Sequence, residues 1–250
     1  MNVQKTPAVA RFLGVLGGMG PLATADFLAK LVAVRPAQSD QAHLPVLVWG
    51  DCEVPDRTAA LAGLGPSPLP ALLAGARFLD AFGVGAICMP CNTAHHWMDE
   101  LRQACEAPWI DMIQACVSGI RQVQPAVRSV GVLTTAGAAA VDLYPRALRH
   151  AGLHAVTPTP QAMARWVTPG IELVKAHRLT EAAQLLVCAA DELRECGAEV
   201  TLLGCTEIPV ALASAMAAEP QRFIDATSAL AWAAHAHFEA QARPVGAPAW

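Results

Sequence analysis

Short apolar segments alternate with longer segments of helical periodicity along this 250-residue chain. The alternation predicts strands in five places and helices between them. Strands that alternate with helices favour parallel sheets, so we expect an α/β fold. The predicted strands are residues 11–16, 44–49, 85–89, 127–133 and 200–203; the predicted helices are residues 22–34, 69–82, 93–105, 141–151, 179–196 and 207–217.

Two parts of the chain resemble each other. Residues 12–17 (FLGVLG) resemble 129–134 (SVGVLT), and residues 85–93 (GAICMPCNT) resemble 199–207 (EVTLLGCTE). We therefore expect two similar α/β lobes with parallel sheets, related by a pseudo-twofold axis. In open α/β sheets, ligands bind at the carboxyl ends of the strands. The active site is thus expected in the cleft between the lobes.

The same repeat suggests where the lobes begin and end. The first lobe should comprise residues 1–115, completed by a C-terminal helix at about 210–250, and the second lobe residues 116–209. No low-complexity linker divides the chain.

Composition excludes several classes of function. The net charge of −4 disfavours nucleic-acid binding, which needs a clustered basic surface. The long uncharged segment between Arg57 and Arg77 contains three prolines, so it is no membrane-spanning helix. Glycines and Pro21 interrupt the apolar segment near the start, which disfavours a signal peptide. We therefore interpret the eight cysteines as thiols of a cytoplasmic protein.

Cys91 and Cys205 are the candidate catalytic residues. Each follows a predicted strand and precedes a predicted helix, whose first N–H groups favour an anion. An ordinary thiol, with a pKa near 8.5, is only about 3% thiolate at pH 7. Two such thiols on opposite faces of a carbon atom can act together, one removing a proton as thiolate and the other delivering one as thiol.

The alternative for any free cysteine is a small buried apolar side chain. We expect that role for the five cysteines outside such a setting: Cys52, Cys105, Cys116, Cys188 and Cys196.

Cys88 and Cys91 form a CxxC pair close to His95 and His96. This spacing occurs in thiol redox pairs and in zinc sites, where it would supply half of the ligands. No second CxxC is present, and strand alternation turns Cys88 toward the core, so we expect no metal site. His95 and His96 are expected at a helix start near the pocket, where His95 could support the site.

Three further features fit a small carboxylate ligand. The turn at residues 17–21 (GGMGP) opens a helix without matching a dinucleotide fingerprint, although it could be only a tight turn. Arg57 offers a fork that clamps a carboxylate, unless it pairs with Asp56 or Asp51. Lys175 lacks the phosphate-binding surroundings that a pyridoxal-phosphate lysine needs, so no cofactor is expected.

These motifs together resemble the aspartate racemase branch of the Asp/Glu racemase superfamily. The resemblance extends from residue 11 to about residue 230. It is carried by residues 14–24 (GVLGGMGPLAT), 55–58 (PDRT), 89–95 (MPCNTAH), 170–175 (GIELVK) and 203–209 (LGCTEIP).

The resemblance implies a cofactor-independent, two-base amino-acid racemase, and members tend to be homodimers. Cys91 and Cys205 match the catalytic cysteines. Arg57 matches the residue that holds the side-chain carboxylate, and Lys175 a lysine near it. The other positions that match the substrate site are Met19, Asn92, Thr93, Thr135, Thr206 and Glu207.

The chain departs from the family pattern in a few places. Residues 50–53 (GDCE) replace an amide-rich segment, so Asp51 and Glu53 are expected to bring negative charge near the pocket. Ala138 stands where a second threonine is usual, and residues 141–142 (VD) replace small residues. These changes leave several alternatives open: another amino acid as substrate, a maleate isomerase, a hydantoin racemase, an arylmalonate decarboxylase, or a non-catalytic carboxylate-binding protein.

Overall fold

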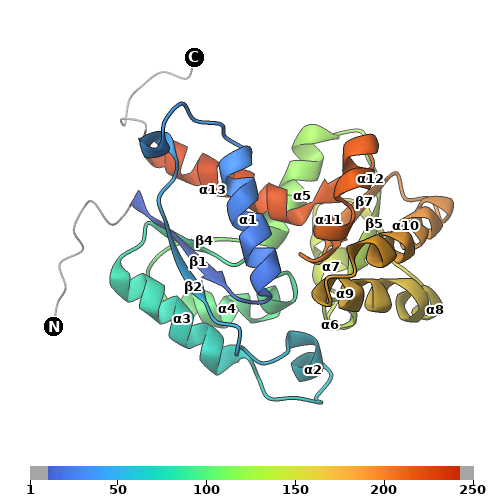
Figure 1. Ribbon diagram of the computed structural model, residues 1–250, viewed down its shortest axis with the longest axis horizontal. Coiled ribbons are helices and arrows are strands. Elements are labelled where there is room, and N and C mark those ends of the chain that lie inside the picture. Colours follow the sequence, from blue (N-terminus) through green and yellow to red (C-terminus); the bar gives the residue numbers. More distant parts are fainter. Residues whose placement is uncertain (1–10, 243–250) are drawn as a thin grey trace.

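The structure, a computed structural model, describes residues 11–242, which form two α/β lobes side by side (Figure 1). Each lobe contains a parallel four-stranded sheet, with strand order β2-β1-β3-β4 in the first and β6-β5-β7-β8 in the second. The identical order confirms the predicted α/β fold of two similar lobes. The strands are β1 (Leu13–Gly17), β2 (Val46–Gly50), β3 (Ala86–Cys88), β4 (Trp109–Ile110), β5 (Ser129–Thr134), β6 (His154–Val156), β7 (Val200–Gly204) and β8 (Phe223–Asp225).

Helices connect successive strands, as parallel pairing requires. In the first lobe they are α1 (Pro21–Ala33), α2 (Arg57–Leu61), α3 (Leu69–Phe82) and α4 (Met98–Ala104), and α5 (Met112–Val123) leads into the second lobe. The second lobe continues with α6 (Ala136–Ala140), α7 (Leu143–His150), α8 (Pro160–Ala162), α9 (Thr168–Lys175), α10 (Leu179–Glu195), α11 (Ile208–Ala211), α12 (Ala213–Ala218) and α13 (Ala226–Ala242). Single turns lie at η2 (Asp40–Ala42), η3 (Thr93–Trp97) and η4 (Met163–Val167).

Three predicted helices differ from the structure. The helix expected at residues 93–105 begins as the 3₁₀ turn η3, and the one expected at 207–217 is divided into α11 and α12. The helix expected at 141–151 begins only at Leu143, because Asp142 adopts a left-handed conformation with φ of 52°. The sequence analysis also missed β4, β6 and β8, which are two or three residues long and therefore show no periodicity.

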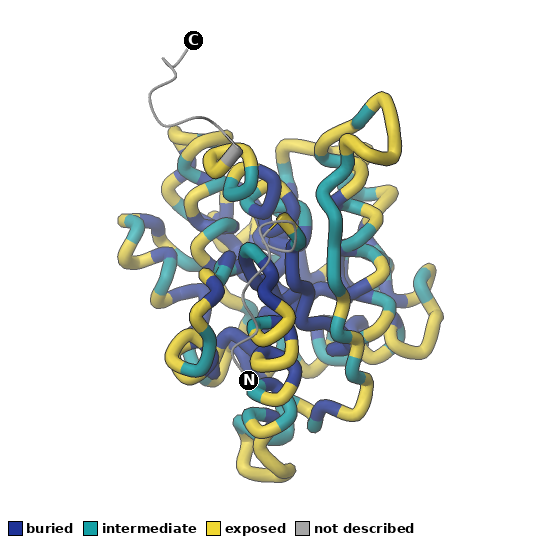
Figure 2. The backbone as a smooth tube through the Cα atoms, turned by 90° about the vertical axis from the view of Figure 1, so that its left-hand side faces the viewer, coloured by how far each residue is buried: buried dark blue, intermediate teal, exposed yellow. Residues whose placement is uncertain are grey.

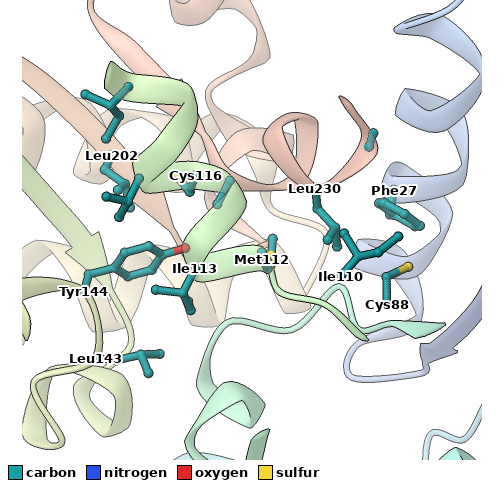
Figure 3. Packing of buried hydrophobic residues seen from close by; sticks show 14 of the residues in the cluster. Phe27, Cys88, Ile110, Met112, Ile113, Cys116, Leu143, Tyr144, Leu202 and Leu230 are labelled. Carbon is teal, nitrogen blue, oxygen red and sulfur yellow. The ribbon is translucent and has the colours of Figure 1, made fainter. Parts of the chain in front are cut away.

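A shared core joins the two lobes (Figure 3). Phe27 and Cys88 come from the first lobe, and Leu202 comes from the second; α5 and α13 contribute the residues between them. Helix α13 packs against α1 and α5 and also contacts strands of both sheets. Buried backbone runs through the middle of the molecule, with exposed segments around it (Figure 2). Helices α5 and α13 pack in the core that both lobes share. The lobe boundaries expected at residues 115 and 209 stay a prediction.

Within residues 11–242, no helix has both the length and the apolar composition needed to cross a membrane.

Candidate active site

A small cavity lies between the lobes, beyond the carboxyl ends of strands from both sheets. Its volume is about 30 Å³. All ten predicted site residues line it, together with three that the sequence analysis did not select, Asp56, Thr58 and Ile171. The ten are Met19, Arg57, Cys91, Asn92, Thr93, Thr135, Lys175, Cys205, Thr206 and Glu207.

The two cysteines reach the cavity by equivalent routes. Cys91 follows β3, and its N–H donates to Met89 O at 2.8 Å in a tight turn. Cys205 follows β7, where the Thr134 hydroxyl donates to Gly204 O at 2.7 Å. A turn of five residues follows Cys91 and a helix of four follows Cys205. These elements align few peptide dipoles, so they stabilise a thiolate less than a long helix would. Nearby charged side chains must therefore contribute more of that stabilisation.

Arg57 controls the surroundings of Cys91. Burial raises the pKa of Cys91, which is 5% exposed, and the Arg57 guanidinium opposes that shift. Arg57 Nη1 donates to Val54 O at 3.2 Å and to Pro55 O at 3.1 Å, which fixes the side chain. Arg57 Nε is buried and has no hydrogen-bond partner among the described residues. Arg57 thus supplies positive charge and an unused donor beside the Cys91 thiol.

Glu207 controls the surroundings of Cys205. The Cys205 thiol donates to Glu207 Oε2 at 3.1 Å, and the Thr206 hydroxyl donates to the same oxygen at 3.1 Å. Burial and the Glu207 carboxylate raise the pKa of Cys205 well above its ordinary value, and Lys175 acts in the opposite direction. Cys205 therefore holds its proton, which points toward a carboxylate able to accept it.

Asn92, Thr93 and Thr135 place hydrogen-bonding groups on the cavity wall. Asn92 Oδ1 accepts a hydrogen bond from the Tyr144 hydroxyl, and Asn92 Nδ2 is buried with no partner in the described part of the chain. Across the lobes, Thr93 Oγ1 and Thr135 Oγ1 lie 2.8 Å apart. Unpaired buried donors are costly unless a ligand satisfies them. The free donors of Asn92 and Arg57 therefore suit a carboxylate.

Comparisons with known proteins agree with this chemistry. Residues 16–234 match the family described as Asp/Glu/hydantoin racemase. The chain belongs to the Asp/Glu/hydantoin racemase family. A solved aspartate racemase of Picrophilus torridus is 29% identical, with a TM-score of 0.82 over 92% of this chain and 94% of that one.

Two curated relatives are racemases that differ in the amino acids named as their substrates. A broad specificity amino-acid racemase, RacX of Bacillus subtilis, is 26% identical over 88% of this chain and 94% of its own length. A glutamate racemase of Deinococcus radiodurans is 30% identical over 85% of this chain and 69% of its own. The solved glutamate racemase of Francisella tularensis, at 18% identity and a TM-score of 0.67, shares the fold.

In this member of the racemase family, α2 closes the cavity against α6 of the other lobe. A Cβ atom on Gly137 would lie 2.8 Å from Thr58 Cα, so only glycine permits this approach. Arg57 is the first residue of α2, so the contact also sets the position of its guanidinium.

A Gly137→Ala variant should lower kcat/KM for racemisation about 10- to 100-fold, because the added methyl group displaces α2 and Arg57 by a fraction of an ångström or more. Steady-state kinetics checks this prediction. Gly119→Ala in α5 is the matched control, since a Cβ there meets no atom within 4 Å. The control should retain full activity; an equal loss in both variants would contradict a role for the α2–α6 contact.

His95 supports Cys91 from behind the cavity. Met112 N–H donates to His95 Nε2 at 3.1 Å, so the ring proton is on Nδ1, which donates to Cys91 O at 2.8 Å. Burial lowers the pKa of His95, which keeps the ring neutral. Both ring nitrogens are thus occupied by the backbone. Residues 11–242 contain no cluster of three His, Cys, Asp or Glu side chains able to hold a metal ion, and Cys88 lies in the shared core.

The structure departs from the expectations for Asp51, Glu53 and four of the cysteines, and it bears on two readings that the sequence left open, an ion pair of Arg57 and a ligand-binding turn at residues 17–21. Asp51 and Glu53 do not line the cavity; Asp51 instead accepts from Glu53 N at 2.8 Å. Asp56 caps α2 by accepting from Ala59 N at 2.8 Å rather than pairing with Arg57. In the turn at residues 17–21 only Met19 reaches the cavity, and Gly18 N donates to Thr24 Oγ1 at 2.9 Å. Of the five cysteines expected to be buried, only Cys116 is; Cys105 is half-buried, and Cys52, Cys188 and Cys196 are exposed.

Proposed function

We propose that the protein is an amino-acid racemase that inverts the α-carbon with Cys91 and Cys205 and without a cofactor. The observation that carries this proposal is the placement of two buried thiols on one cavity whose other free groups are donors suited to a carboxylate. Membership of the racemase family supports it independently.

The reaction needs one proton removed from one face of the α-carbon and one proton added to the opposite face. Cys91, as thiolate beside Arg57, takes the α-proton, and Cys205 gives its thiol proton to the other face. Cys91 ends as a thiol and Cys205 as a thiolate, so the reverse reaction uses the same pair with roles exchanged. The pair titrates as a coupled system.

The surrounding groups stabilise the charge that develops between the two steps. Removing the α-proton moves negative charge onto the carboxylate oxygens of the substrate. Asn92 Nδ2 is a buried donor for that charge, and of the bonded hydroxyls of Thr93 and Thr135, the one that accepts from the other keeps its own proton to donate. Glu207 accepts the hydrogen bond of the Cys205 thiol and so holds its proton ready for delivery.

Aspartate is the proposed substrate. Arg57 and Lys175 line the cavity and offer two cations for a second, side-chain carboxylate. The likeness to the Picrophilus torridus aspartate racemase supports this choice. We further propose a homodimer in the cytoplasm, where thiols stay reduced, in keeping with eight unpaired cysteines.

Incubation with L-aspartate in deuterated buffer, with no added cofactor, tests the proposal. We expect D-aspartate that contains deuterium at the α-carbon. Glutamate and neutral amino acids are run beside it, and maleate and 5-substituted hydantoins test the related reactions. Absence of both inversion and exchange with every amino acid would overturn the proposal. Calorimetric binding of aspartate without exchange would instead identify a carboxylate-binding protein.

A further inference from the structure

Tyr144, the single tyrosine of the chain, lies behind the cavity and does not line it. It belongs to α7 of the second lobe, and its side chain is fully buried in the shared core. Its ring lies beside α5, with the hydroxyl toward the helix that carries Cys116 (Figure 3). The hydroxyl donates a hydrogen bond to Oδ1 of Asn92 in the first lobe. Asn92 is only 2% exposed.

This bond decides which end of the Asn92 amide faces the cavity. An amide has an acceptor oxygen and a donor nitrogen at nearly equivalent positions, and either can point at a ligand. The Tyr144 hydroxyl occupies the oxygen, which leaves the two N–H donors of Nδ2 for the cavity. Burial raises the pKa of Tyr144 well above its ordinary value, so the hydroxyl stays protonated and available as a donor.

We propose that Tyr144 is a positioning residue, which holds the Asn92 amide so that its nitrogen, and not its oxygen, meets the carboxylate of the substrate. The inference rests on the proposed function, because a carboxylate ligand is what makes the orientation matter. Without the hydroxyl, Asn92 Oδ1 is buried and unpaired, and a rotated amide would point its oxygen at the negatively charged ligand. Binding of the substrate by Asn92, in the first lobe, therefore depends on the Tyr144 hydroxyl in the second lobe.

Tyr144→Phe removes this hydrogen bond and keeps the ring in the core. We expect KM for the amino-acid substrate to rise about tenfold, the scale of one hydrogen bond to a charged group. kcat should fall by a smaller factor, since Asn92 Nδ2 holds the carboxylate before the reaction and also meets the negative charge that develops on it. A defect in core packing alone would lower the fraction of active protein, and hence apparent kcat, with KM unchanged.

A double-mutant cycle shows whether Tyr144 acts through Asn92. In an Asn92→Ala background the amide is gone, so adding Tyr144→Phe should change KM by less than about twofold. Thr227→Val is the matched control, because it also deletes a fully buried hydroxyl. Thr227 lies on α13, does not line the cavity, and its hydroxyl has no hydrogen-bond partner among the described residues. KM of this control should equal that of the wild type.

Two results would overturn the inference while leaving the proposed racemase intact: an unchanged KM in Tyr144→Phe, or an equal rise in KM with and without Asn92. If the wild type exchanges no α-proton, the proposed function fails separately, and the same variants are compared by the calorimetric Kd of succinate. The inference then requires a tenfold weaker Kd in Tyr144→Phe that disappears in the Asn92→Ala background. A protein that neither exchanges α-protons nor binds succinate would overturn both.

Discussion

Replacing either Cys91 or Cys205 with alanine should reduce racemisation about 10⁴-fold, the upper range for loss of a positioned acid or base. Each enantiomer needs one thiol on each face of its α-carbon, so neither variant can complete an inversion. Chiral chromatography of the products measures the loss. Because the equilibrium constant of a racemisation is one, kcat/KM must fall equally for both enantiomers, which provides an internal check.

The two variants should differ in α-proton exchange. The thiol that remains in each can still remove a proton from the face it contacts and return a deuteron to that face. We therefore expect Cys91→Ala to exchange the α-proton of one enantiomer slowly and Cys205→Ala that of the other, both without inversion. Deuterium incorporation by NMR, started from each pure enantiomer, gives this result directly.

Cys88→Ala is the matched control for both variants. Cys88 is fully buried three residues before Cys91, but it belongs to the shared core and does not line the cavity. It should racemise aspartate at the wild-type rate, which also tests the CxxC spacing. Full turnover by either single-alanine variant of the catalytic pair would contradict a two-base mechanism.

The position of Cys91 and Cys205 was predictable from the sequence because it depends on a rule of topology. The repeat placed each cysteine directly after a strand, and parallel strands in one sheet end at the same edge. The structure brings both to one cavity. Arg57 could be selected because it is the only lysine or arginine between Arg35 and Arg77, whereas Lys175 was selected because it matches a lysine of the family pattern.

The contact of Tyr144 with Asn92 was not predictable in this way, and neither was the position of residues 51–53 relative to the cavity. Tyr144 contacts Asn92 across 52 positions and between lobes, and nothing in the apolar pattern of α7 distinguishes a hydroxyl with a partner from one without. Asp51 and Glu53 are close to Arg57 in sequence but do not line the cavity. Burying two unpaired carboxylates would be costly; Glu53 is exposed, and the half-buried Asp51 carboxylate accepts a hydrogen bond from Glu53 N.

The short strands were missed because periodicity needs length, whereas α5 (Met112–Val123) was missed although its buried residues repeat at helical spacing. Three strands of two or three residues contain less than two periods of alternation. The segment at 207–217 contains four alanines that favour a helix, but the chain divides it after Ala211, where α11 packs against α9 and α10. Tertiary contacts, which a single sequence does not display, decide such interruptions.

An Arg57→Ala variant should lose about 10²- to 10³-fold in kcat/KM for aspartate, the range for removing one partner of a buried charged contact. Two physical effects combine. In the proposed aspartate complex the side-chain carboxylate loses its fork, and Cys91 loses the cation that opposes the effect of burial on its pKa. The pKa of Cys91 therefore rises in the variant. In the proposed mechanism Cys91 takes the α-proton as thiolate, so the acidic limb of the pH profile of kcat/KM should move to higher pH.

Substrates without a side-chain carboxylate separate the two effects. Alanine has no group for the Arg57 fork, so its kcat/KM should fall only by the part due to Cys91, and the preference of the enzyme for aspartate over alanine should decrease. Arg57→Lys keeps the charge but loses the fork; it should keep the pH profile near that of the wild type while KM for aspartate still rises. If Arg57→Ala slows aspartate and alanine by the same factor, Arg57 serves Cys91 alone and the side-chain carboxylate is held elsewhere, with Lys175 as the cation that also lines the cavity.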